Sequence, residues 1–162
     1  MQNIISAWRR GLAVAFVFAG MAGCEKTVES TIAQTQVTST TFEFMTWYLE
    51  PAADVLWDNA GYVLTVDGEE DLQPVDQAGW DRVRDAATVV AEGGNLMVMP
   101  GYLVDEPDWK DYAAGVTAAA LSAREAAQAK DADALFQAGA NLYSACLACH
   151  NRYIQNQPTV TP

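Results

Sequence analysis

Apolar residues recur at alternating intervals of three and four in two long stretches, and this spacing most constrains the fold. Over residues 77–97 the series is Trp80, Val83, Ala87, Val90, Gly94 and Met97. Over residues 132–153 it is Leu135, Ala138, Leu142, Ala145 and Cys149. Residues three and four apart share one face of an α-helix, so each series predicts a helix with one apolar seam.

Two further stretches carry the same helical spacing. Residues 41–59 form one candidate helix, in which Pro51 lacks an N–H and crowds the carbonyl of Trp47, so we expect a kink or break there. Residues 107–130 form an Ala-rich candidate that opens with Pro107 and acidic residues, which suit a helix N-terminus. Asp131 is the expected N-cap of the helix over 132–153.

These four candidates are joined mainly by short connections. Only residues 62–66 alternate as a strand would, and this run is too short to build a sheet. The sequence therefore predicts an all-α fold, an antiparallel four-helix bundle over residues 40–156, with a disordered tail at 157–162.

The N-terminus has the pattern of an export signal. Residues 1–23 combine Arg9 and Arg10 with an apolar run that is too short to cross a bilayer. Residues 21–24 resemble a bacterial lipobox, which implies cleavage before Cys24 and a lipid on its thiol. The alternative is ordinary cleavage after Ala22. Residues 24–39 are polar and predict a flexible tether.

Charge and cysteine content limit the partners. The formal net charge is -12, from 9 basic and 21 acidic residues, which disfavours nucleic acid and favours partners with basic surfaces. The acidic group Asp67, Glu69, Glu70 and Asp71 is either a solvated loop or a docking patch for such a partner. Of three cysteines, Cys24 belongs to the lipobox, so no disulfide between distant elements is expected.

The run from Cys146 to His150 is C-x-x-C-H, the attachment pattern for haem c. On a helix, positions i, i+3 and i+4 lie on one face of one turn. Two thiols there can add to the two vinyl groups of one haem, and the imidazole of His150 can coordinate the iron from the same side. We therefore predict one covalent haem c held by Cys146, Cys149 and His150.

Two other uses of the cysteine pair are weaker. A thioredoxin-type C-x-x-C would open a helix after a strand, whereas this pair comes late in a predicted helix. A zinc site needs four ligands, and the chain has one histidine and no second cysteine pair.

The sixth iron position cannot be a second histidine. It is filled by Met, Lys, water or an external molecule, or it stays empty. Met45 faces inward near the start of the first helix, which in an up-down bundle lies near the end of the last helix; Met97 is the second candidate. Four aromatic residues either wall a haem pocket or form plain core: Trp47, Tyr48, Trp57 and Trp80. Arg152 either pairs with a haem propionate or sits at a solvated helix end.

With the motif on the last of four helices, the chain resembles the cytochrome c prime family over about residues 41–154. Tyr153 matches an aromatic common three places after the haem histidine, whereas Ile154 stands where a basic residue is usual. Residues 45–58 resemble the first helix of exported bacterial bundle cytochromes. In low-spin relatives a methionine there binds the iron, which implies that role for Met45; high-spin relatives bind small gases at an open site.

The leading functional prediction is single-electron transfer in the periplasm by a membrane-anchored lipoprotein. The alternative is binding or sensing of a small gas such as nitric oxide at an open sixth site, and a third is a lipoprotein whose haem is purely structural. No nucleophile has a base beside it, so the chain is not expected to be an enzyme. The expected partners are redox proteins with basic surfaces, and pairing with a second copy is left open.

Overall fold

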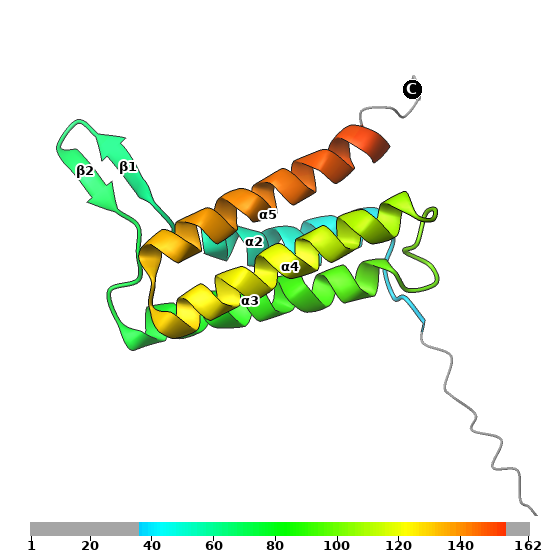
Figure 1. The fold of residues 1–162 in the computed structure, drawn as a ribbon, viewed down its shortest axis with the longest axis horizontal. Coiled ribbons are helices and arrows are strands. Elements are labelled where there is room, and N and C mark those ends of the chain that lie inside the picture. The colour runs from blue at the N-terminus through cyan, green and yellow to red at the C-terminus, as the bar shows by residue number, and fades with distance from the viewer. Residues whose placement is uncertain (1–35, 155–162) are drawn as a thin grey trace, which may run out of the picture. The chain divides into compact units, whose positions relative to one another are not determined.

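The structure, a computed structural model, describes residues 36–154. In chain order its elements are α1 (Thr41–Phe44), the π-helix η1 (Met45–Leu49), α2 (Glu50–Trp57), β1 (Tyr62–Thr65), β2 (Gly68–Asp71), α3 (Gln77–Met97), α4 (Asp108–Ala129) and α5 (Ala132–Tyr153) (Figure 1). The prediction of a mainly helical chain is confirmed. The predicted signal at 1–23, the lipid site Cys24 and the tail at 157–162 lie outside the described residues.

The two helices predicted from the clearest apolar seams are confirmed at both ends. Aspartates cap both: Asp76 accepts from the Gly79 N–H at 2.7 Å, and Asp131 accepts from the Ala134 N–H at 2.9 Å. The Ala-rich helix is one residue shorter at each end than predicted, because Pro107 is its N-cap and Lys130 takes a left-handed conformation, φ 55°, that ends it.

The break expected at Pro51 takes the form of a π-helical turn. Residues 41–57 stay helical throughout, but η1 replaces the α-helical pattern just before the proline, and the Glu50 N–H bonds to the Met45 carbonyl. The wider turn moves the backbone away from the proline ring, which would otherwise crowd the carbonyl four residues earlier. The helix predicted to reach residue 59 ends at Trp57.

A β-hairpin joins α2 to α3, so the prediction that residues 62–66 cannot build a sheet is wrong. β1 pairs with β2 in antiparallel register, with Tyr62 opposite Asp71 and Thr65 opposite Gly68. Gly68 has φ 130°, a conformation that suits glycine in the tight turn. The acidic group is therefore mostly a strand and not a loop, although every residue of both strands is exposed.

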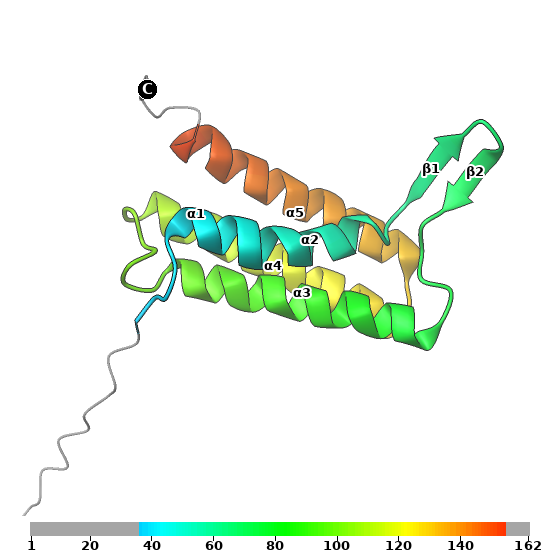
Figure 2. The same cartoon turned by 180° about the vertical axis from the view of Figure 1, so that it is seen from behind.

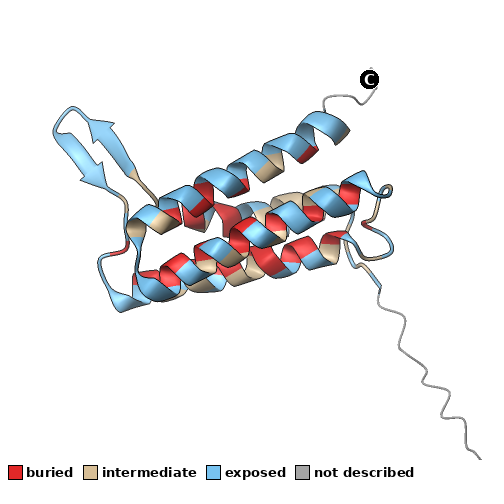
Figure 3. Ribbon diagram, in the orientation of Figure 1, coloured by how far each residue is buried: buried red, intermediate tan, exposed pale blue. Residues whose placement is uncertain are grey.

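Small residues let α3 and α4 pack closely along their lengths (Figures 1 and 2). A Cβ built on Gly94 would lie 2.1 Å from Thr117 Oγ1 and 2.9 Å from the Ala113 carbonyl oxygen. The glycine in this seam thus admits a neighbouring backbone. α5 packs on α4, and α2 contacts α3 more than it contacts α5. Figure 3 shows the buried residues on the sides of the helices that face one another, and the hairpin exposed.

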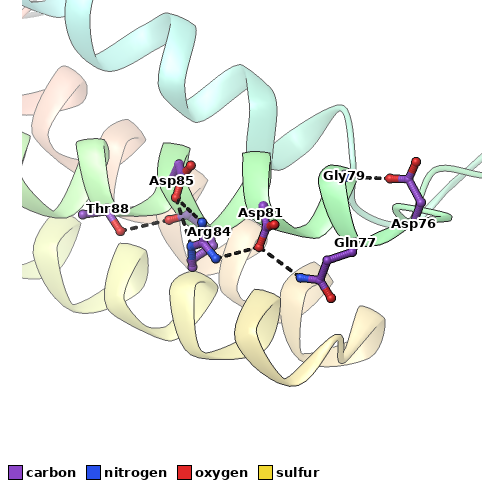
Figure 4. A network of polar contacts seen from close by, with 7 residues as sticks. All are labelled: Asp76, Gln77, Gly79, Asp81, Arg84, Asp85 and Thr88. Carbon is purple, nitrogen blue, oxygen red and sulfur yellow. Dashed lines mark hydrogen bonds and ion pairs between the residues drawn. The ribbon is translucent and has the colours of Figure 1, made fainter.

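Charged side chains on α3 form ion pairs and hydrogen bonds with neighbours on the same helix (Figure 4). Arg84 pairs with Asp81 at 2.6 Å and with Asp85 at 2.7 Å, while Gln77 donates to Asp81 at 3.0 Å. Hydrogen bonding to Asp85 is the main cause that raises the pKa of Arg84. Arg84 therefore offsets the charge of one of these two carboxylates, and the three side chains together carry one negative charge.

Candidate cofactor site

A cavity of about 500 Å³ opens between α5 and the helical segment 41–57. Ligand pockets in proteins typically have volumes of about 300–1,000 Å³, so this space suits a cofactor. Its lining is mostly apolar, and it includes Met45, Leu49, Trp57, Leu142 and Val116. The sparse contact between α2 and α5 leaves this space, whereas α3 and α4 close against each other.

All three residues of the predicted haem motif line this cavity. Cys146 and Cys149 are free thiols on α5; Cys149 is buried with 5% exposure, and His150 is exposed at the mouth. Helix α5 runs unbroken through the motif, so the three side chains come from about one helical turn. Sulfur and imidazole are thereby presented together to one apolar space.

Burial keeps both thiols protonated. Burial raises the pKa of Cys146, and it raises the pKa of Cys149 to about 11, with smaller contributions from Cys146 and Asp105. A thiolate would be poorly solvated in this apolar wall. Both raised pKa values favour the neutral thiol form at the cavity wall.

Both methionines suggested as iron ligands line the same cavity. Met45 opens η1 and is partly buried, whereas Met97 is 2% exposed at the end of α3. Leu49, at the end of η1, also lines the cavity. The π-helical turn therefore presents a thioether and a branched apolar side chain from one segment to the space that α5 presents with its thiols and imidazole.

The four aromatic residues predicted either to wall a haem pocket or to form core do not all take the same role. Only Trp57 of the four lines the cavity, and its Nε1 donates to the Gly139 carbonyl on α5 at 3.1 Å. Trp80 lies in the packed core elsewhere, and Trp47 is 71% exposed. Trp109, which sequence reasoning missed, lines the cavity and donates from Nε1 to the Met97 carbonyl at 2.7 Å.

The end of α5 is fixed to the connection between α3 and α4. Tyr153 donates to Asp105 at 2.5 Å, and partial burial together with that carboxylate raises the pKa of the phenol. Arg152 lies 3.5 Å from Asp108. Arg152 thus already faces a carboxylate, and its pairing with a haem propionate remains a prediction.

The donor set and the lining fit a covalently held tetrapyrrole. Two thiols and one imidazole share a wall that is otherwise apolar. Exposed apolar side chains such as Phe42 and Ile154 also line the cavity, and a bound hydrophobic group would cover them. Within residues 36–154 no cluster of three or more His, Cys, Asp and Glu is placed to hold a metal ion.

The comparisons with known proteins give no family. No protein-family model, no curated protein and no solved structure matches this chain. Among the described helices, none combines the length and the apolar character needed to cross a bilayer.

Proposed function

We propose that this protein is an exported c-type cytochrome of the cytochrome c prime superfamily, with its helices in an antiparallel four-helix bundle. It carries one haem c on α5 and transfers single electrons. One observation supports this most: Cys146, Cys149 and His150 line a single apolar cavity of about 500 Å³, with Met45 in the same lining.

In this proposal each residue has a distinct task. Cys146 and Cys149 would bond the haem through two thioethers, which prevents its loss by dissociation, and His150 would coordinate the iron. Met45 would provide the sixth ligand. When bound, the haem supplies a one-electron couple. The apolar lining would exclude water and, with a thioether ligand, raise the reduction potential.

The cofactor is tested by an absorption spectrum and an intact mass. The full chain, exported from cells that mature cytochromes, is expected to show haem bands and the added mass of one tetrapyrrole. A variant with Cys146→Ala and Cys149→Ala should retain no haem after denaturation, whereas Ser144→Ala, exposed on the same helix, should retain it. A colourless wild-type protein without added mass would refute the proposal.

The sixth ligand is tested separately. Met45→Ala is expected to abolish the charge-transfer band of methionine ligation and to lower the reduction potential, because a thioether favours the reduced iron. Met99→Ala serves as control, since Met99 does not line the cavity. If Met45→Ala leaves the spectrum unchanged, Met97 becomes the next candidate.

Binding of a small gas is the second candidate function, and Leu49 favours it. Leu49 and Met45 come from the same turn of η1, and both line the cavity. If Leu49 instead of Met45 faced the iron, the sixth site would lack a protein ligand, and a small gas could bind there. A high-spin spectrum in both oxidation states, with a shift on adding nitric oxide, would select this function over electron transfer.

The proposed location is the periplasm, with a lipid on Cys24 as membrane anchor. Partners would be redox proteins with basic surfaces, because the net charge is -12 and the carboxylates of β2 are exposed. Mass spectrometry of the mature N-terminus tests the anchor: an unmodified thiol at Cys24 would contradict it.

A further inference from the structure

The last turn of α5 is held by one hydrogen bond to a neighbouring connection. Tyr153 Oη donates to Asp105 Oδ1 at 2.5 Å, across 48 residues of sequence. The tyrosine ring also lies edge-on to Trp109, with ring centroids 5.0 Å apart and planes at 72°, and to Tyr112 at 6.0 Å. Tyr153 is thus fixed at its hydroxyl and at its ring.

The partner side of this contact is itself anchored. Trp109, at the start of α4, donates from its indole to the Met97 carbonyl, and both residues are buried. Tyr102 of the same connection stacks on Phe44 with ring centroids 4.6 Å apart. The connection that carries Asp105 is therefore anchored at Tyr102 and, just after it, at Trp109, although Val104 and Glu106 beside Asp105 are exposed.

Tyr153 lies three residues after His150, so the two side chains belong to the same turn of α5. We propose that Asp105 and Tyr153 are positioning residues for the iron site: Tyr153 holds the turn that carries His150, and the Asp105 carboxylate places a negative charge beside it. This inference rests on the proposed function.

The two residues act through different physical effects. The Tyr153 hydrogen bond limits fraying of the helix end, where backbone carbonyls have no partner further along the helix. The Asp105 charge is half-buried, so water screens it only in part. A negative charge near the iron favours the more positive, oxidised form and therefore lowers the reduction potential.

Tyr153→Phe removes the hydrogen bond but keeps the ring and the charge. In the full chain made without haem, amide exchange at Tyr153 and Ile154 is expected to quicken by about tenfold, the effect of one hydrogen bond. The control Tyr143→Phe, on the exposed side of the same helix, should leave this exchange unchanged. Equal exchange in both variants would overturn the positioning role of Tyr153.

Asp105→Asn removes the charge but keeps an acceptor for the tyrosine hydroxyl. In the haem-loaded protein the reduction potential is expected to become more positive than in the wild type, with an unchanged absorption spectrum. Asp111→Asn, an exposed carboxylate on α4 outside the cavity lining, is the matched control. A shift no larger than that of the control would overturn the role of Asp105.

The proposed function and the positioning roles of Tyr153 and Asp105 are refuted by different results. If the wild-type chain takes up no haem, the proposed function is refuted. The role of Asp105 is then refuted as well, because there is no iron site for it to influence. The amide-exchange comparison does not need haem and still decides whether Tyr153 holds the end of α5. If haem is bound but neither variant differs from its control, only the positioning inference is overturned.

Discussion

The α3–α4 interface is closed, whereas the space between α5 and the segment 41–57 is open. At the closed interface Gly94 lies against Thr117, and Ala120 and Ala123 have 0% exposure. At the open one, about 500 Å³ remains between α5 and the segment 41–57. Small residues line the closed interface, whereas larger side chains such as Met45, Leu49 and Trp57 line the open space.

Large side chains contact α5 at the two ends of the cavity. Trp57 reaches α5 at Gly139, and a Cβ built on that glycine would lie 3.4 Å from the indole. At the other end Tyr153 lies between Asp105 and Trp109. The Trp57 contact joins α2 to α5, whereas the Tyr153 contacts join α5 to the α3–α4 connection and to α4. Large side chains therefore fix α5 at both ends of the cavity, while close packing at Gly94 brings α3 and α4 together.

The largest effect is expected from truncating buried leucines of α5 in the protein without haem. Leu135 lies in the packed core and Leu142 borders the cavity, and both have 0% exposure. Leu135→Ala should lower the free energy of unfolding by about 3–5 kcal/mol, and Leu142→Ala by about 2–3 kcal/mol, because Leu142 has fewer contacts to lose. Urea unfolding followed by circular dichroism measures both, and equal losses would show that the cavity is closed in solution.

The next effect concerns glycines in the two settings. Gly94→Ala is expected to lower the free energy of unfolding by about 1–2 kcal/mol, because overpacking outweighs a helix-propensity gain of up to about 1 kcal/mol. Gly115→Ala is the matched change on α4, where the nearest atom to a new Cβ would be 3.8 Å away. It should stabilise the protein by about 0.5–1 kcal/mol. Stabilisation by both changes would contradict close packing at Gly94.

A third expectation follows from the raised pKa of Cys149, about 11. At pH 8 Cys149 of the folded protein without haem should react with iodoacetamide roughly a hundredfold more slowly than Cys149 of the same chain in urea, where thiols have a pKa of about 8.5. The folded pKa lies above the unfolded one, so stability is full below about pH 8.5 and falls as the pH rises toward 11. Equal alkylation rates in both states would contradict the burial of Cys149.

The smallest effect is expected at the hairpin. The Leu72 N–H bonds to the Gly61 carbonyl at 2.9 Å, so residues 62–71 can be replaced by an Asn-Gly turn without moving the ends of the helices. The free energy of unfolding should change by less than about 0.5 kcal/mol, because no residue of either strand is buried. A loss above about 2 kcal/mol in thermal unfolding would show that the hairpin packs against another surface.

Sequence reasoning found the parts of the fold that rest on local repetition. The seams of α3 and α5 and the cap at Asp131 need only residues that are close in sequence. The cysteine pair and His150 could also be selected from sequence, because the chemistry predicted for them depends on spacing within one turn; that chemistry stays a prediction. The structure brings these residues together with Met45 in one cavity lining.

Other features depend on information that spacing does not carry. Pro51 indicates that the helix is disturbed, but it does not say that the disturbance is a π-helical turn. Asp67–Gly68 is a known hairpin signal, and it indicates the turn between β1 and β2. Which tryptophan borders the cavity depends on helix rotation and on the length of the α3–α4 connection, so Trp109 could not be chosen over Trp80 from sequence.

The position of α5 in the chain has a consequence for biosynthesis. The ribosome makes the wall that contains Met45 and Leu49 early, and it makes the two thiols after every other described helix. If the chain carries haem as proposed, its apolar cavity stays open to water until the haem is attached. During that interval the chain would be most prone to aggregate or to be degraded, so its cellular yield is expected to depend on the supply of haem more than on the rate of translation.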